Sequence, residues 1–482
     1  MKKRILSLAL SLVLAIGAVA ISVPVTSYAV TDTALAKNCS SYAMVLGTNV
    51  WYVANFASVP ASDDGNIYVC EMKTYEYELG NTTVPIMAIP ATANIDVKFP
   101  LNYVPGVMGR LYNKFVLAVI RNGEIVMINE PQYITNPEAV AKSSKPRKER
   151  PVKALQEKNV ANIFMDGVAT PSEANVGAFH GVFSVDSPTV IVADATCEQA
   201  DTHPVKNNPI AGYMMNANDD IGVQGLITEM TNYAANSNIQ DFVIGNEVNE
   251  RCWNYMPWVD WDTYVRRYVQ VFRVCYTAIK ATNPNAMVYT SLDQVWNKNP
   301  KGKDYYEYID GDEFLAKFNS MINAGGNIDW NMSIHPYPNP LFYAKFWDLS
   351  GVANGATYKA QVAKNQVITF QNMSVLTNVL QQTAYLNRYG KVRDVIIGEI
   401  GMGTNAGGES QAAGVCASYA AFEMNPYVTQ YLYLEVDING FFPTLVGKGK
   451  EAFEAMGTAN EQQYMDWAKN YIGITDWSEV IR

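Results

Sequence analysis

Histidine is scarce in this 482-residue chain, and its cysteines are not spaced to bind a metal. The three histidines, His180, His203 and His335, lie far apart, and no group of His and Cys has the spacing of a zinc site. The glycine-rich segment 401–408 is not followed by the Lys-Ser or Lys-Thr of a phosphate-binding loop. The sequence therefore predicts no metal and no other cofactor.

Long apolar runs are also rare, and the one that is present lies at the N-terminus. It runs from Ile5 to Ile21, follows three basic residues, and precedes the small residues around Ala29. This pattern is typical of a signal peptide, which we place at residues 1–29. No later stretch is long and apolar enough to span a bilayer. We therefore expect a secreted protein, extracellular or at the cell surface.

Basic charge is in deficit: the chain has 36 Lys and Arg against 46 Asp and Glu. Loss of the leader removes three basic and no acidic residues, which leaves the mature chain with a net charge of 33 − 46 = −13. Such a balance argues against nucleic acid and anionic surfaces as partners. Aromatic residues make up 12% of the chain and supply faces on which sugars can stack. A neutral carbohydrate is therefore a compatible partner, and the oligomeric state stays open.

Six cysteines in an exported chain allow up to three disulfides, and the sequence does not choose among the pairings. Cys39 with Cys70 could close the N-terminal segment, and Cys197 with Cys252 could join two loops. Isolated buried thiols are an equally good interpretation.

Residues 41–135 have the pattern of an all-β domain. Asn122-Gly123 is a strong hairpin signal between two of its strands. We expect seven short strands, at residues 42–46, 50–56, 66–72, 84–89, 95–99, 115–120 and 124–128, and a small sandwich-like accessory domain. A polar, basic stretch follows at residues 136–153. It is best interpreted as a solvated linker, with binding to a cell wall as the alternative.

Residues 154–482 alternate between apolar strand-like runs and amphipathic helical runs, as expected of a (β/α)8 barrel. We predict strands at residues 162–165, 189–193, 211–215, 242–245, 286–290, 330–334, 395–398 and 430–435. Helices are predicted at residues 261–281, 312–322, 373–389 and 409–422. The fold class is therefore α/β: a TIM barrel preceded by a small all-β domain.

Two of these strands end in a carboxylate. Asp241-Phe-Val-Ile-Gly-Asn-Glu247 and Asp394-Val-Ile-Ile-Gly-Glu399 are apolar, β-branched runs, which is how a buried parallel strand delivers an acid to the mouth of a barrel. Paired acids of this kind perform glycoside hydrolysis: one donates a proton to the leaving oxygen and the other attacks the sugar. The proton donor must stay protonated near neutral pH, and an ionised carboxylate close by favours this.

Other residues at these strand ends complete a candidate site. Asn246 can offer its amide to a sugar hydroxyl, and Asp293, His335 and Tyr337 follow the next two strands. Each has a structural alternative, which for Asp293 is a loop cap. Among the aromatic residues of the same loops, we expect Trp253, Trp258 and Trp296 to be exposed and to stack on sugars.

The arrangement resembles clan A glycoside hydrolases, which are retaining (β/α)8 enzymes with Asn-Glu ending the fourth strand and Glu ending the seventh. Gly245-Asn-Glu-Val-Asn249, Ser291-Leu-Asp-Gln-Val-Trp296 and Ile397-Gly-Glu-Ile-Gly401 are most similar to a largely uncharacterised bacterial family of exported predicted glycosidases. The resemblance covers about residues 151–440. It implies Glu247 as acid/base, Asn246 as its hydrogen-bonding neighbour, Glu399 as nucleophile and Tyr337 as a partner of Glu399.

The chain departs from the clan pattern at the last strand, where Tyr431-Leu-Tyr-Leu-Glu-Val-Asp437 lacks the usual tryptophan. The leading hypothesis is a secreted retaining glycoside hydrolase that cleaves a poly- or oligosaccharide. The alternative is a non-catalytic carbohydrate-binding or cell-surface protein that keeps the barrel as a scaffold.

Overall fold

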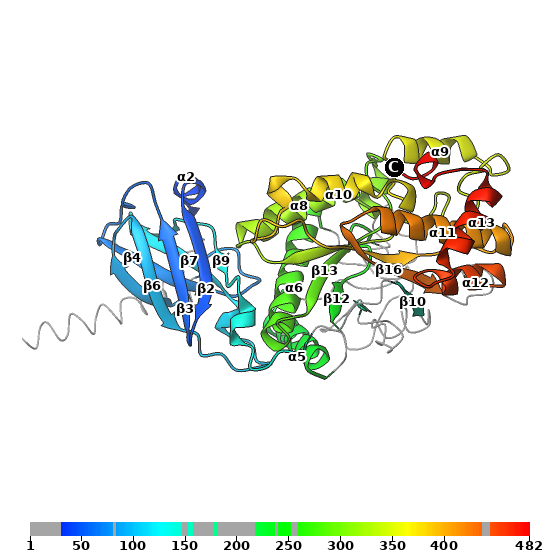
Figure 1. Ribbon diagram of the computed structural model, residues 1–482. Helices are drawn as coiled ribbons and strands as arrows, with labels where there is room; N and C mark the ends of the chain where they lie inside the picture. Colours follow the sequence, from blue (N-terminus) through cyan, green and yellow to red (C-terminus); the bar gives the residue numbers. More distant parts are fainter. Residues whose placement is uncertain are drawn as a thin grey trace, which may run out of the picture.

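The computed structural model describes residues 30–80, 83–146, 153–157, 178–181, 217–236, 240–251, 259–435 and 444–482. The chain forms an N-terminal β part and a larger α/β part, which lie side by side (Figure 1). The predicted signal peptide, Trp253, Trp258 and the Cys197–Cys252 pair lie outside the described residues. Within the described ranges, no helix has the length and apolar character needed to cross a membrane.

The β part consists of two sheets. One has the order β1-β8-β7-β4-β5, with β9 also paired to β7, and the other has the order β2-β3-β6. The strands are β1 (Val30–Thr31), β2 (Ser40–Leu46), β3 (Asn49–Asn55), β4 (Asn66–Met72), β5 (Pro85–Pro90), β6 (Asn94–Pro100), β7 (Lys114–Arg121), β8 (Glu124–Met127) and β9 (Gln132–Tyr133). A strand is present at each of the seven predicted places. Asn122 and Gly123 both have positive φ, 52° and 76°, as the predicted tight hairpin requires.

The side chains of β4 alternate between the two faces of its sheet, and Cys70 forms no disulfide with Cys39. Ile67 and Val69 belong to the main core, whereas Cys70 packs with Val116 and other residues in a separate small cluster. Successive strand side chains point to opposite faces, so Cys70 faces away from the sheet that Cys39 precedes. Both cysteines are free thiols, so for this pair the interpretation as isolated thiols holds and the disulfide does not form.

The α/β part is built on seven parallel strands in the order β10-β16-β15-β14-β13-β12-β11. They are β10 (Lys153–Glu157), β11 (Ala178–Gly181), β12 (Asp241–Ile244), β13 (Met287–Leu292), β14 (Trp330–Ile334), β15 (Val395–Ile400) and β16 (Val428–Glu435). Every residue of β12, β14 and β15 is buried, as expected for strands covered on both faces. Over the described residues the sheet has the form of half a barrel, and closure into eight strands stays a prediction.

The beginning of the sheet differs from the prediction. The predicted strands at residues 162–165, 189–193 and 211–215 lie outside the described residues, whereas β10 and β11 were not expected. β10 begins at Lys153, the last residue of the predicted linker, and pairs in parallel with β16. Its sequence, Lys-Ala-Leu-Gln-Glu, is too polar and too short for its periodicity to indicate a strand.

The larger helices belong to the α/β part, where several of them pack on one another (Figure 1). They are α5 (Asp220–Asn236), α6 (Trp261–Thr282), α8 (Gly311–Ala324), α9 (Gly355–Ala363), α11 (Gly408–Met424), α12 (Lys448–Ala455) and α13 (Glu461–Ile472), with shorter helices at α2 (Thr33–Lys37), α7 (Lys303–Glu307) and α10 (Ser374–Leu380). Asp260 caps α6 by accepting the Thr263 N–H at 2.8 Å. The helix predicted at residues 373–389 is shorter than expected, because the chain leaves α10 at Gln381 and becomes extended at Gln382.

The two parts dock through backbone and side-chain hydrogen bonds. The Tyr133 N–H donates to the Gly325 carbonyl at 3.0 Å, and Gln132 Nε2 donates to the Ala324 carbonyl at 2.9 Å. A Cβ at Gly325 would lie 2.8 Å from the Tyr133 ring, so only glycine allows this approach. Arg388 of the α/β part forms an ion pair with Glu138, which lies in the segment 136–153 that follows the β part.

Candidate active site

Glu247 lies in a sharp turn immediately after β12. Gly245 and Glu247 have φ values of 80° and 43°, and a left-handed conformation is costly for a residue that has a Cβ. The turn is held against β13, because the Glu247 N–H donates to Ser291 Oγ at 3.3 Å and the Val248 N–H donates to the Ser291 carbonyl at 3.0 Å. Backbone strain of this kind is typical of functional positions, where the surrounding structure maintains it.

Glu399 lies within β15, and glycine beside it makes room for an imidazole. The Glu399 side chain is 7% exposed. A Cβ at Gly398 would lie 2.0 Å from Ser333 Oγ and 3.2 Å from His335 Nε2. Gly398 therefore permits His335 to lie against β15, next to the carboxylate. The motif that contains Gly398 does not by itself reveal this requirement, because His335 is distant in the sequence.

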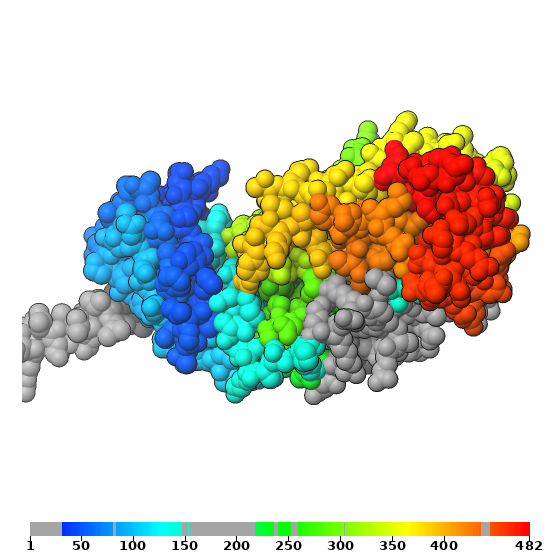
Figure 2. Space-filling model, viewed as in Figure 1, coloured from blue at the N-terminus to red at the C-terminus, as the bar shows by residue number. Residues whose placement is uncertain are grey.

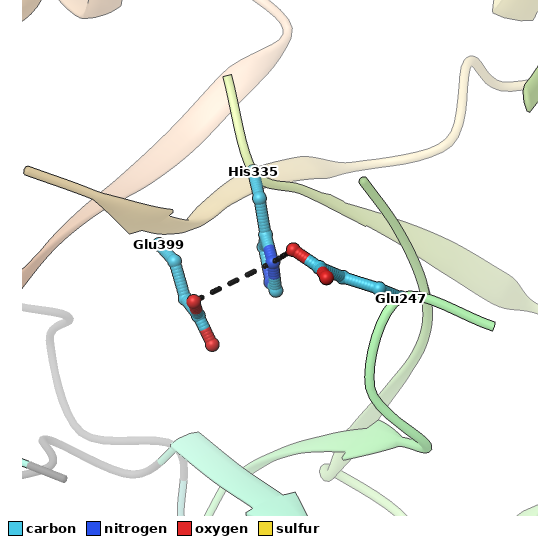
Figure 3. Close-up of side chains that lie close together, drawn as sticks. All are labelled: Glu247, His335 and Glu399. Carbon is cyan, nitrogen blue, oxygen red and sulfur yellow. Dashed lines mark hydrogen bonds and ion pairs between the residues drawn. The ribbon is translucent and has the colours of Figure 1, made fainter. Parts of the chain in front are cut away.

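His335, at the end of β14, lies between the two glutamates (Figure 3). Its Nδ1 is 2.7 Å from Glu247 Oε1 and 3.6 Å from Glu399 Oε2. One oxygen of each carboxylate and the imidazole nitrogen all lie within 4.8 Å of one another. β12, β13, β14 and β15 are consecutive neighbours in the sheet, so the two acids converge from strands three positions apart. The structure thus brings together the glutamates and the histidine that the sequence selected.

Tyr337 supports Glu399 from the same loop as His335. Its hydroxyl donates to Glu399 Oε2 at 2.8 Å, and the residue is 4% exposed. Burial, with the nearby Glu247 carboxylate, raises the pKa of Tyr337 well above its ordinary value. The hydroxyl therefore keeps its proton at any physiological pH and is a permanent donor to Glu399.

Tyr337→Phe should lower kcat by about 10- to 100-fold and leave KM nearly unchanged, because a hydrogen bond to an ionised group is worth roughly 1.5–3 kcal/mol. Steady-state kinetics would measure the split. Tyr427→Phe is the matched control: it also loses a tyrosine hydrogen bond, to Gln381 Oε1 at 3.0 Å, but lies immediately before β16, at the opposite end of the sheet. Equal effects of the two variants would contradict a site role for Tyr337.

Asp293 lies beneath the Glu247 turn and contacts protein groups. Asn249 Nδ2 donates to Asp293 Oδ1 at 2.6 Å, the Val295 N–H donates to the same oxygen at 2.9 Å, and the Asp293 N–H donates to Asn249 Oδ1 at 3.1 Å. These contacts favour the loop-holding interpretation of Asp293 over substrate binding, and Asn249 is a partner that the sequence analysis did not single out.

Burial, reinforced by the Glu250 carboxylate, raises the pKa of Asp293 well above its ordinary value of 3.8. The folded protein must therefore keep a proton on Asp293 that the unfolded chain releases as the pH rises past about 4. The stabilising contribution of this group is present at low pH and is lost as the pH rises toward the folded-state pKa.

Asp293→Asn, which imitates the protonated acid, should therefore gain stability relative to wild type as the pH rises from 4.5 to 8. The gain is at most about 1.4 kcal/mol per pH unit. Urea unfolding at the two pH values measures it. Asp348→Asn should show almost no trend over this pH range, because hydrogen bonds from Ser350 lower the pKa of Asp348 and the carboxylate is then ionised in both the folded and the unfolded chain. A pH-independent difference for Asp293→Asn would contradict the protonated state.

The remaining predicted residues have different outcomes. Asn246 is half-buried in the turn beside Glu247, and its contact with a sugar stays a prediction. Trp296 was expected to be exposed, and this expectation is wrong. The side chain is 5% exposed and belongs to the main core, where it packs so closely on the start of α8 that a Cβ at Gly311 would lie 3.1 Å from its ring.

Glu247, His335 and Glu399 are also the group in the described residues that could hold a metal ion. Two carboxylates and an imidazole are common ligands of divalent transition metals. However, the 2.7 Å contact between His335 and Glu247 is a direct hydrogen bond, so these two side chains already satisfy each other. The three side chains therefore fit either two acids bridged by an imidazole or a metal site.

Comparison with known proteins gives a family for the chain. Residues 185–440 match the sequence profile of a family of unknown function, DUF5722, and this range is more than half of the 482 residues. The chain belongs to this family. As a DUF5722 protein it carries both glutamates, His335 and Tyr337 inside the matched range. No curated protein matches the chain.

Solved structures that are similar to this DUF5722 protein include a glycoside hydrolase, the β-glucuronidase of Ruminococcus gnavus. One crystal structure of that enzyme has a TM-score of 0.30 and 10% identity, and covers 90% of this chain and 68% of its own. A second structure has a TM-score of 0.32 and 9% identity, with the same coverage of both chains. A complex with uronic deoxynojirimycin has a TM-score of 0.31 and 9% identity. The functional assignment below depends on the site geometry.

Proposed function

We propose that this protein is a secreted retaining glycoside hydrolase that cleaves a poly- or oligosaccharide. The observation that carries the proposal is the approach of Glu247 and Glu399: one carboxylate oxygen of each lies within 4.8 Å of the other and of a His335 ring nitrogen. Retaining enzymes place their two carboxyl groups about 5–5.5 Å apart, whereas inverting enzymes need roughly 6.5–9.5 Å to admit a water. The separation supports direct attack by one carboxylate.

In the first step, Glu399 attacks the anomeric carbon and Glu247 gives its proton to the departing glycosidic oxygen. The C–O bond to the leaving sugar breaks and an ester to Glu399 forms. In the second step, the Glu247 carboxylate takes a proton from water, and the water oxygen displaces Glu399 from the anomeric carbon. The product is the free sugar, and both glutamates return to their initial protonation states.

The neighbouring residues orient the two acids for these steps. The Tyr337 hydroxyl holds Glu399 Oε2, and the His335 imidazole contacts Glu247 Oε1. Asn246 is placed to offer its amide to a sugar hydroxyl next to the reacting carbon. Such a contact strengthens as the ring flattens toward an oxocarbenium ion.

The β part, residues 41–135, is proposed as an accessory domain joined through residues 136–153 to the catalytic part. The acidic balance of the chain, 36 Lys and Arg against 46 Asp and Glu, favours a neutral glycan.

Release of new reducing ends from glycans tests the activity. The mature protein is incubated with a panel of neutral and acidic glycans, with and without EDTA. We expect release from a neutral glycan that EDTA does not alter. No release over the whole panel would contradict the proposal, and loss of activity in EDTA would favour a metal-dependent hydrolase.

A non-catalytic carbohydrate-binding protein is the second candidate, and one observation favours it. Tyr433, near the end of β16, is fully buried, and its hydroxyl accepts the Met402 N–H at 3.0 Å. This residue therefore offers no open ring as the floor of a sugar subsite. Binding of a glycan without release of reducing ends would support this second candidate.

A further inference from the structure

A groove of about 720 Å³ runs along the seam between the β part and the α/β part. One wall is formed by the start of β2, including Ser40 and Tyr42, and by Glu130. The other wall is formed by the loop after α8 and by Arg388 and Tyr389. Figure 2 shows the seam, where the blue-to-cyan N-terminal part meets the yellow and green segments of the α/β part. The groove is distinct from the candidate active site, none of whose residues line it.

The groove and the two glutamates lie at opposite ends of the parallel strands. The loop after α8, residues 324–327, precedes β14, and Tyr389 precedes β15, so both mark the amino ends of these strands. His335 and Glu399 lie at the carboxyl ends of the same two strands. β14 has five residues, which at about 3.3 Å per residue separates its two ends by roughly 17 Å. A ligand in the groove therefore does not reach the reacting bond.

The walls of the groove are rigid and polar. Asn136 exchanges two hydrogen bonds with the Val45 backbone, at 2.7 and 3.1 Å, and Gln132 donates to the Ala324 carbonyl at 2.9 Å. The Asn136 amide fixes the wall formed by β2, and the Gln132 amide joins the two parts, so the groove is preformed before any ligand enters. A preformed polar concavity loses little entropy when it binds a ligand.

Two tyrosine rings flank the groove, and both are open to a ligand. Tyr389 is 62% exposed and Tyr42 is 36% exposed. Each ring is held in place: Arg388 Nη2 donates to the Tyr389 hydroxyl at 2.7 Å, and Tyr42 packs edge-on against Trp51 with the ring centres 5.6 Å apart. Fixed, exposed aromatic rings beside hydroxyl groups are suited to the apolar faces and polar edges of a sugar.

The charges of the groove select against an anionic ligand. Arg388 is neutralised by its ion pair with Glu138, and Glu130 adds an exposed carboxylate. No lysine lines the groove within the described part of the chain. The net charge of the lining is therefore −1, which disfavours uronates, sulfated sugars and phosphates.

We propose that this groove is a second, non-catalytic binding site for a neutral oligosaccharide. It holds a polymer at one end of the sheet while the glutamates act at the other. The choice of a carbohydrate rests on the proposed function, whereas the position, polarity and charge of the groove stand independently of it.

Affinity electrophoresis of the full mature chain, wild type and variants, tests the site. The probes are three neutral polysaccharides: xylan, glucomannan and soluble starch. Tyr389→Ala should weaken binding of the preferred polymer by about tenfold, since one stacked ring is lost. Tyr389→Phe, which keeps the ring, should bind nearly as wild type. Tyr471→Ala is the control for loss of an exposed tyrosine elsewhere, on α13, and should change nothing.

The failure of this site can be distinguished from the failure of the proposed function. Tyr389→Ala should hydrolyse a small aryl glycoside at the wild-type rate while it loses affinity for the polymer. If wild type cleaves the glycoside but Tyr389→Ala and Tyr42→Ala both bind every polymer as wild type does, the groove proposal is overturned and the catalytic proposal stands. Tighter binding of polygalacturonate than of the neutral polymers, or no binding of any polymer, would also overturn the groove proposal.

Discussion

Glu399→Gln should lower kcat for glycan hydrolysis by roughly 10⁴-fold or more, since the variant lacks the carboxylate that attacks the anomeric carbon. Glutamine has the same shape, and its carbonyl oxygen can still accept the Tyr337 hydroxyl that is 2.8 Å from Glu399 Oε2. The fold should therefore persist, with an unfolding midpoint close to that of wild type. Reducing-end release under saturating substrate, together with thermal unfolding, measures both effects.

Glu409→Gln is the matched control for this variant. Glu409 lies ten residues further along, in the first turn of α11, with a 62% exposed side chain whose contact with Lys448 is a surface ion pair at 3.8 Å. Surface pairs of this kind contribute little, so activity and stability should both stay near wild type. Wild-type turnover by Glu399→Gln would remove Glu399 from the mechanism.

Glu247→Gln should have an effect that depends on the leaving group. With a natural sugar as the leaving group, loss of the proton donor should lower kcat/KM by about 10²- to 10⁴-fold. With an aryl glycoside whose phenol is acidic, departure needs no proton, so the first step should stay fast and the Glu399 ester should accumulate. A burst of phenol release followed by slow turnover is the expected time course.

Sodium azide distinguishes this role from a general structural one. Azide attacks the anomeric carbon of the ester without losing a proton, so it replaces the water that Glu247 would activate, and the Glu399 carboxylate leaves. Added azide should speed turnover of the aryl glycoside by Glu247→Gln and yield a glycosyl azide. Equal losses for both leaving groups, with no response to azide, would contradict the assignment of Glu247 as the acid/base.

The strands that carry the acids could be predicted from the sequence because they are continuous apolar runs. β12 and β15 are buried along their whole length and stop close to a carboxylate, so pattern and environment agree. The left-handed conformation of Glu247 could not be predicted in this way. It depends on Ser291, a neighbour 44 positions further along the chain, which holds the turn against β13.

The wrong predictions concern properties that tertiary packing decides. Trp296 follows β13 in a loop, where composition suggests exposure, but the start of α8 covers it. β10 was missed since only Ala154 and Leu155 in it are apolar, although it pairs with β16 over five residues.

The anomeric configuration of the first product tests the two-glutamate mechanism most directly. Proton NMR of the reaction of wild type with its substrate, recorded before the product mutarotates, reports this configuration. Since Glu247 and Glu399 approach within 4.8 Å, the sugar should be released with the configuration of the bond that was cleaved. Release of the opposite anomer would show that water attacks directly, which contradicts a covalent ester on Glu399.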